Sequence, residues 1–189
     1  MKRRDDFMAR ELRATEVRVP CRISYAHVID TDKNDNYSVS LLIPKSDTKT
    51  IAAVKKAIEA AIIDGKSKLA NKDGGINRKM LKLPLRDADE EGKTGDYANM
   101  MFFNAKSKRR PQIVDRHKEM IYDSDSIYSG CYCNVMINFY AFAMEGNKGI
   151  AAGLGNIQKV KDGDRLGFGG TSAEDDFDSF DDDDDEDIF

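Results

Sequence analysis

CYCNVMINFYAFA, residues 131–143, is the stretch that decides the fold. Its odd positions are uniformly apolar, whereas its even positions, Met136 apart, carry polar or aromatic side chains. Alternation over this length is typical of a β-strand with one face in a hydrophobic core. The stretch therefore predicts a sheet protein, with these residues on the core face: Cys131, Cys133, Val135, Ile137, Phe139, Ala141 and Ala143.

Shorter segments upstream show the same alternation. Residues 17–25 place apolar side chains at odd positions, ending at Tyr25, and residues 37–43 do so again after the turn-rich run DTDKNDN. The two segments are expected to form a hairpin. Further strands are predicted at 100–104, 113–114 and 150–160. In the first of these, alternation sets Met100 and Phe102 opposite Met101 and Phe103, so only one pair is expected in the core.

One helix interrupts the strands. Ser46 or Asp47 is a suitable N-cap, and apolar residues then recur at helical spacing from Ile51 to Ile62. The helix is expected to end near Asp64. Residues 66–99 are rich in Gly, Asn, Asp and Lys and are expected to form long loops. Five or so strands without βαβ alternation predict a mostly β protein, a small antiparallel barrel with one inserted helix.

The charge is divided sharply along the chain. Eleven of the 34 acidic residues lie within residues 174–189, which contain no basic residue. The rest of the chain has 30 basic against 23 acidic residues, a net charge of +7, although the whole chain carries −4. The predicted organisation is a flexible charged arm at 1–14, one folded domain at 15–170 and a disordered acidic tail at 171–189.

The three cysteines do not suggest a metal site. A structural zinc takes about four nitrogen or sulfur ligands, and no second cysteine pair accompanies Cys131 and Cys133. We expect small core residues, no metal and no cofactor. An odd cysteine count without a signal peptide or long apolar run favours a reduced, cytoplasmic protein that does not associate with membranes.

Enzyme signatures are also missing. The sequence has no GxxxxGK[ST], HExxH or GxSxG motif, and Gly153-Leu154-Gly155 lacks the third glycine of a dinucleotide fingerprint. The acidic patch Asp87, Asp89, Glu90 and Glu91 resembles a two-metal nuclease site only in composition, because all four residues belong to one predicted loop. We therefore expect no catalytic residues.

The outward strand faces form the predicted binding surface. Cations there can follow phosphates, and exposed aromatic rings can stack on bases, worth ~1 to 3 kcal/mol per base by alanine substitution. This combination fits one strand of nucleic acid. The alternative is that the tyrosines form ordinary surface pairs or are covered by other elements. The residues are Arg18, Arg22, Ser24, Ser38, Ser40, Tyr132, Asn134, Asn138 and Tyr140.

A basic loop adds to this surface. Lys106, Lys108, Arg109 and Arg110 directly follow the aromatic pair Phe102 and Phe103. Basic residues beside aromatics are more specific for nucleic acid than basic residues alone, although such a run can also be a solvated loop. Lys82, from the apolar segment 80–85, completes the predicted set of contacts.

The tail ends in two apolar residues. An acidic segment of this kind can occupy the basic groove of the body as a DNA mimic and can recruit basic partners through its end. The alternative is a tail that only increases solubility. The residues expected to contact partners are Asp181, Asp182, Asp183, Asp184, Asp185, Glu186, Asp187, Ile188 and Phe189.

Four segments resemble the phage and prophage family of OB-fold single-stranded DNA-binding proteins. They are YSVSLLIPKSDTK (37–49), KSKRRPQIVD (106–115), YSGCYCNVMINFYAF (128–142) and NKGIAAGLGNIQKV (147–160). The resemblance implies an OB-fold barrel that coats single-stranded DNA without catalysis during replication, recombination and repair in the bacterial cytoplasm. It also implies that the tail contacts a polymerase, helicase or primase.

Other interpretations stay open. The chain can be an adaptor whose tail mimics DNA against a host DNA-binding protein, or, less in keeping with the motifs, a nuclease using the acidic patch. A homodimer, in which the tail of one copy lies in the groove of the other, is as compatible with the sequence as a monomer.

Overall fold

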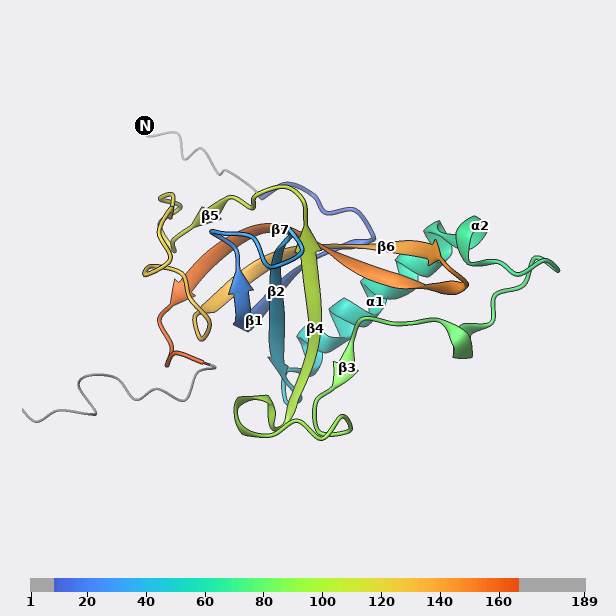
Figure 1. The fold of residues 1–189 in the computed structure, drawn as a ribbon, viewed down its shortest axis with the longest axis horizontal. Coiled ribbons are helices and arrows are strands. Elements are labelled where there is room, and N and C mark those ends of the chain that lie inside the picture. The colour runs from blue at the N-terminus through green and yellow to red at the C-terminus, as the bar shows by residue number, and fades with distance from the viewer. Residues whose placement is uncertain (1–8, 167–189) are drawn as a thin grey trace, which may run out of the picture.

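The long alternating segment forms the central strand of a barrel. In the computed structural model, which describes residues 9–166, it is β6 (Tyr132–Met144). It pairs antiparallel with β1 (Glu16–His27) on one side and β7 (Asn147–Lys161) on the other. Residues of β6 are buried at alternate positions as far as Ala141, which confirms the predicted core face over most of its length. Figure 1 shows β6 and β7 running side by side.

Two further strands close the barrel. β2 (Tyr37–Pro44) pairs with β1 and with β4 (Met100–Ser107), and β4 pairs with β7, for example at Ala105 opposite Ala152. The five strands therefore form a ring, as predicted for an OB-type barrel. The β4–β7 pairing is parallel, so the expectation of an antiparallel barrel holds for every pair in the ring except the closing one. Short strands β3 (Arg86–Asp87) and β5 (Ile113–Val114) extend the sheet.

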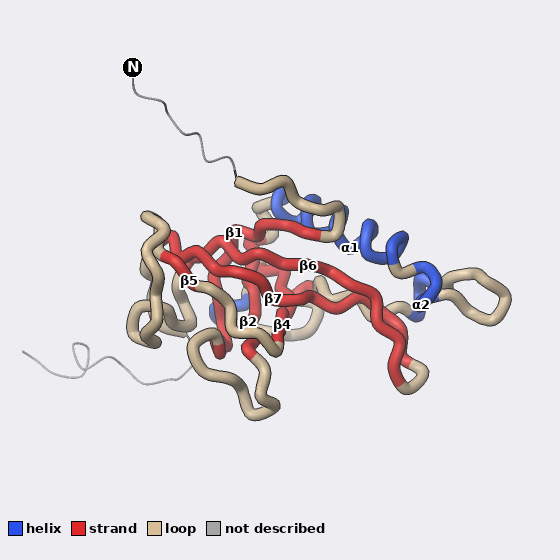
Figure 2. Tube along the Cα trace, turned by 90° about the horizontal axis from the view of Figure 1, so that it is seen from above, coloured by secondary structure: helices blue, strands red, loops and turns tan. Residues whose placement is uncertain are grey.

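The predicted helix is α1 (Thr48–Asp64). Asp47 caps it by accepting a hydrogen bond from the backbone N–H of Thr50, so the predicted start and end are confirmed. Its apolar face packs against β1 and β6, which places the helix along one side of the barrel (Figure 2). The remaining helical elements are short: α2 (Lys66–Leu69) and single 3-10 turns at Arg78–Met80 and Gly95–Tyr97.

The expectation that only one phenylalanine of β4 is buried was wrong. Phe103 lies in the main core, where its ring centroid is 5.5 Å from that of Phe139. Phe102, on the opposite face of β4, is only 2% exposed because a second, smaller cluster of Leu42, Ala88 and Leu166 surrounds it. Both faces of β4 are therefore apolar at this point.

Local irregularities explain the other differences from the alternation pattern. A β-bulge between Ser24 and His27 gives Tyr25 a positive φ of 46° and turns its side chain outward, where it is 65% exposed. Ser24 is buried instead. Ala143 is exposed because the β6–β7 hairpin extends beyond the barrel, as Figures 1 and 2 show. Ser40 is buried, although alternation placed it on the outer face.

Candidate nucleic-acid interface

A groove of about 1070 Å³ crosses the outer face of β2 and β4. The β1–β2 loop, residues 28–36, supplies one wall, and the segment around Lys82 together with the β6–β7 hairpin supplies another. We call this feature the main groove. Its polar and aromatic lining consists of Tyr25, His27, Asp32, Lys33, Asn34, Ser38, Ser40, Lys82, Arg86, Lys93, Tyr97, Phe102, Asn104, Lys106 and Phe142.

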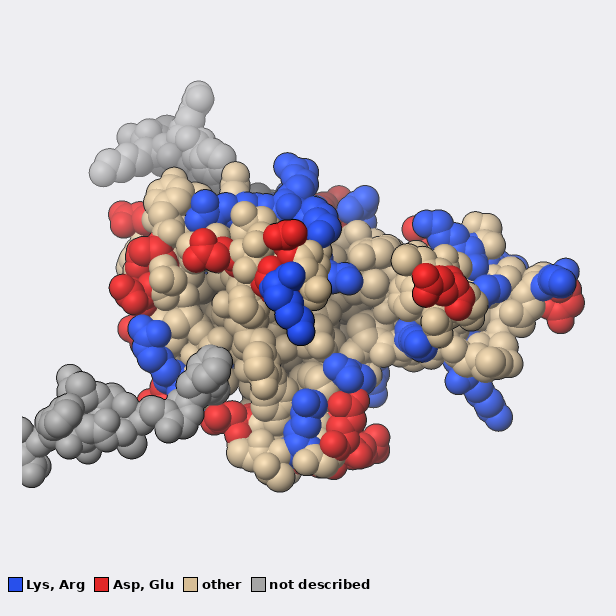
Figure 3. Space-filling view, in the orientation of Figure 1, with Lys and Arg blue, Asp and Glu red and all other residues tan. Residues whose placement is uncertain are grey.

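The main groove is strongly basic. It contains five lysine or arginine side chains and a single carboxylate, that of Asp32. Arg86 pairs with Glu91 at 3.2 Å, but none of the ion pairs within residues 9–166 involves the four lysines. Basic side chains surround the surface over the middle of β4 in Figure 3. Four ammonium groups are thus available for an anionic ligand.

Asp32 stays ionised and is held by hydrogen bonds from the β1–β2 loop and from the start of β2, so the groove keeps an excess of positive charge. Its Oδ1 accepts hydrogen bonds from the backbone N–H groups of Asn34 (2.8 Å) and Asn36 (3.2 Å), and its Oδ2 accepts one from Ser38 Oγ (2.9 Å). These bonds hold the pKa of Asp32 below its usual value. Lys108 Nζ ties the same loop to the end of β4 by donating to the carbonyl oxygens of Asn34 and Asp35.

Besides Phe102 in its floor, three aromatic rings reach the main groove from different elements. Tyr25 stands outward from the β1 bulge, Phe142 is half-buried on β6 and Tyr97 follows the long loop before β4. Tyr97 meets Phe102 edge-on at 5.6 Å and donates a hydrogen bond to Ser24 Oγ. Strained backbone such as that of Tyr25 is concentrated at functional sites, where it positions a side chain.

Close packing against Gly149 holds the segment around Lys82, one wall of the main groove, in place. The backbone N–H of Lys82 donates to the carbonyl of Lys148, and its carbonyl accepts from the N–H of Ile150. A Cβ on Gly149 would lie 2.1 Å from the Lys82 carbonyl oxygen, so only glycine allows this approach. The wall is thereby attached to the β6–β7 hairpin, and Lys82 is held at the edge of the groove.

Three of the twelve predicted DNA contacts line the main groove. Lys82 and Lys106 are exposed there, Lys106 from within β4 rather than from a loop. Phe102 lies in the floor, covered by the Arg86 guanidinium 4.4 Å from its ring centroid. Phe103 is in the core and cannot stack on a base, so its prediction was wrong.

The guanidinium of Arg22 is engaged by other residues of the protein rather than free to contact DNA. Its Nε donates to the carbonyl of Gly130, its Nη2 donates to the carbonyl of Asp164, and its Nη1 is 3.5 Å from an Asp96 carboxylate oxygen. The guanidinium also lies over the ring of Tyr132, at 5.6 Å. Both residues therefore help to hold the segment after β7 and lie outside the main groove.

The other predicted contacts are also outside the main groove. Asn134 is hydrogen-bonded to Gln158, and Tyr140 is exposed on the outer side of β6. Arg109 and Arg110 are exposed in the loop after β4. The sequence pattern did not predict these residues of the groove: Tyr25, His27, Lys33, Arg86, Lys93, Tyr97, Asn104 and Phe142.

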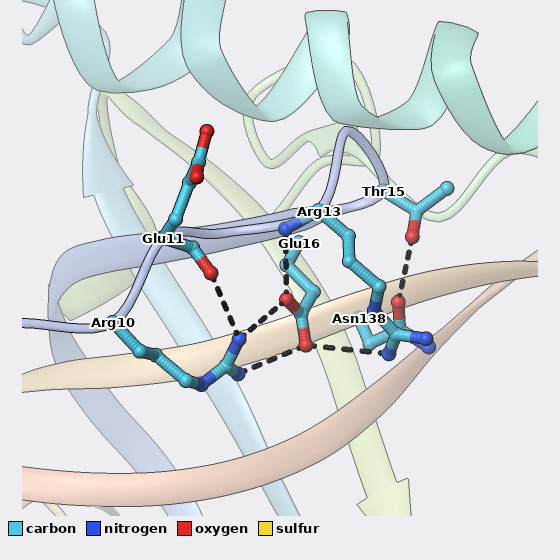
Figure 4. A network of polar contacts seen from close by, with 6 residues as sticks. All are labelled: Arg10, Glu11, Arg13, Thr15, Glu16 and Asn138. Atoms are coloured by element: carbon cyan, nitrogen blue, oxygen red, sulfur yellow. Dashed lines mark hydrogen bonds and ion pairs between the residues drawn. The ribbon is translucent and has the colours of Figure 1, made fainter.

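Arg18 lies in a different depression, of about 440 Å³, which we call the second hollow. A network between the N-terminal segment and β1 forms one side of it (Figure 4). Arg10 donates two hydrogen bonds to the Glu16 carboxylate, at 2.8 and 2.9 Å, and the backbone N–H of Arg13 donates a third at 3.0 Å. These bonds lower the pKa of Glu16 to about 2.

The acidic patch is bound by a lysine. Lys45 Nζ lies 2.7 Å from Asp87 and 2.6 Å from Asp89, and these bonds lower the pKa of both carboxyls. Within residues 9–166, no group of three His, Cys, Asp or Glu residues is arranged to hold a metal ion. The nuclease interpretation therefore has no geometric support.

All three cysteines are buried, as predicted for core residues. Cys21 on β1 pairs in register with Cys133 on β6, and burial raises the pKa of both thiols. Over the described range 9–166, no helix has the length and apolar character needed to cross a bilayer.

Known proteins that resemble this chain show its family. The family model described as "Enterobacter phage Enc34, ssDNA-binding protein" matches residues 15–189. The chain belongs to this family. Putative protein p50 of Acyrthosiphon pisum secondary endosymbiont phage 1 is 34% identical over 148 residues, which cover 75% of this chain and 78% of that protein.

Solved structures extend the match to the fold. The single-stranded DNA-binding protein from bacteriophage Enc34 has a TM-score of 0.65 and 25% identity, covering 90% of this chain and 97% of that one. Its complex with ssDNA also has a TM-score of 0.65, at 24% identity, covering 84% and 97%. The predicted family is confirmed, whereas the predicted tail contacts, Asp181 to Phe189, lie outside the described residues.

The Glu16 network predicts a pH-dependent contribution to stability. Because the pKa of Glu16 is lower in the folded than in the unfolded chain, its stabilisation is fully present above about pH 4.5 and is lost as the pH falls towards 2. Glu16→Gln should therefore unfold at lower urea concentration than the unmodified chain at pH 7, and the difference should shrink between pH 4.5 and 2. Glu11→Gln is the matched control, and an equal effect from it would contradict the assignment.

Proposed function

We propose that the chain binds single-stranded DNA in the main groove, largely independently of sequence. One observation carries the proposal: unpaired lysines and aromatic rings converge on the outer face of the second and third barrel strands, β2 and β4, beside the β1–β2 loop. This is the face through which OB-folds bind oligonucleotides. The Enc34 protein, of the same family and fold, has been solved with ssDNA, which supports the same substrate here.

The lining explains why recognition would not depend on sequence. Lysine ammonium groups contact phosphates, which are identical at every nucleotide, and rings such as Tyr25 and Phe142 can stack on any base. An OB unit of this kind covers ~4 to 16 nucleotides. We infer a non-catalytic protein that coats and protects exposed strands during phage DNA replication, recombination and repair in the host cytoplasm.

The acidic tail would regulate access to the main groove. Leu166, the last described residue, packs in the cluster that contains Phe102, a residue of the groove floor. The described part of the chain therefore ends beside the groove floor, and the acidic residues further along the sequence are opposite in charge to the groove lysines. We propose that the tail competes with DNA for this surface and, once displaced, recruits replication proteins such as a polymerase, helicase or primase.

A titration with oligo-dT tests the proposed function. Removing residues 174–189 should increase affinity for oligo-dT, because an intramolecular competitor is lost, and log K should fall with log salt by ~0.7 for each phosphate contacted. Fluorescence titrations with oligo-dT, oligo-U and duplex DNA at two salt concentrations measure this for both chains. If the shortened chain does not bind oligo-dT at low salt, the proposal is wrong.

Tyr25 provides a residue-level test of the main groove. Tyr25→Ala should weaken oligo-dT binding by about 1 to 3 kcal/mol through loss of base stacking, with little change in the salt dependence because no charge is removed. Tyr122→Ala is the control, since Tyr122 is 69% exposed but does not line the groove. Equal affinities for the two variants would show that bases do not stack at the β1 bulge.

A further inference from the structure

Successive outward side chains of β6 connect the main groove with the second hollow. Phe142 lines the main groove, whereas Asn138 and Met136 line the second hollow. Tyr140 comes between them on the same face of the strand and is 43% exposed. Because side chains two residues apart share one face of a strand, the outer face of β6 forms a continuous surface from one depression to the other.

The pairing of β4 with β7 joins the same two depressions. Lys106, exposed in the main groove, pairs with Gly153, which lines the second hollow. Gly153 has no side chain, and a β-carbon added there would lie 3.5 Å from Cε1 of Tyr140. The Tyr140 ring therefore lies beside the bare backbone of β7, at the boundary between the main groove and the second hollow.

Arginine side chains surround this boundary. Arg109 and Arg110 are exposed in the loop after β4, and that loop returns to the barrel at the second hollow, where the backbone N–H of Gln112 donates to Asn156 Oδ1 at 3.2 Å. Arg18 is exposed within the second hollow. None of the three arginines takes part in an ion pair within residues 9–166, so their charge is available to an anionic ligand.

The lining of the second hollow suits a phosphodiester group. Its one carboxylate, that of Glu16, is bound by Arg10 at 2.8 Å and by Arg13 at 3.3 Å, which leaves the charge of Arg18 uncompensated. Asn138 accepts a hydrogen bond through Oδ1, so its NH₂ group can donate to a phosphate oxygen. Among the described residues no aromatic ring lines this hollow, which favours sugar-phosphate backbone over a stacked base.

We propose that single-stranded DNA bound in the main groove continues across the β4–β7 boundary, with one base stacked on Tyr140 and a phosphate beyond it bound by Arg18. The inference rests on the function proposed above and adds a second site for the same strand. Lys106 contacts the backbone where the strand leaves the main groove, and Arg109 and Arg110 flank it at the crossing. The DNA then wraps around part of the barrel instead of crossing one face.

The length of the oligonucleotide separates the two sites. An oligo-dT of about 6 nucleotides, near the lower end of the range that an OB unit covers, should fill the main groove alone, whereas one of about 16 should also reach the second hollow. In fluorescence titrations of the full chain, Arg18→Ala should lower affinity for the longer oligonucleotide about three- to tenfold. Its salt slope should fall by ~0.7, because one phosphate contact is lost, and affinity for the shorter oligonucleotide should stay within about twofold.

Three further variants distinguish the contributions to this path. Tyr140→Ala should weaken binding of the longer oligonucleotide at least about fivefold with an unchanged salt slope, because a ring but no charge is removed. Arg18→Lys keeps the charge and should retain most of the affinity. Lys56→Ala is the control, since it removes an exposed cation of α1 that lines neither depression, and it should change neither affinity.

Two results would overturn the inference. If Arg18→Ala and Tyr140→Ala leave binding of the longer oligonucleotide unchanged, the second hollow lies off the DNA path and suits another anionic ligand, such as an acidic peptide. If both variants weaken the two oligonucleotides equally, the separate second site does not exist. In either case the unmodified chain still binds oligo-dT, whereas absence of binding to both lengths at low salt would refute the proposed function itself.

Discussion

The parallel pairing of β4 with β7 closes the barrel, and the position of the binding surface depends on it. Because β4 is fixed between β2 and β7, its outer face presents Asn104 and Lys106 beside the β1–β2 loop and the β6–β7 hairpin. The same pairing places Lys106 beside Gly153, at the boundary between the main groove and the second hollow. Both depressions thus owe their location to one closing contact.

The core and the helix could be predicted because alternation and helical spacing are local signals. The cap at Asp47, the buried face of β6 and the divided charge were each readable from a few neighbouring residues. The four segments quoted above were enough to identify the family. The order of the strands depends on pairing between residues far apart in the sequence. The alternation pattern therefore could not predict that β4 and β7 pair in parallel.

The groove was less predictable, for physical reasons that differ between residues. Tyr25 has the parity of a core residue, and only the bulge turns it outward. Arg86, Lys93 and Tyr97 come from the segment 66–99, whose path is set by contacts with distant strands, such as the bridge of Lys82 with Gly149. Conversely, Arg22 and Tyr132 had the composition of a binding face but pack against the segment after β7.

Amide chemical-shift mapping of the isotope-labelled full chain with oligo-dT at low salt tests the central claim most directly. The account predicts that the largest changes fall on residues of the main groove, including Tyr25, Asn104 and Ala151. Changes concentrated around Arg22 and Tyr132, with the main groove unaffected, would contradict it.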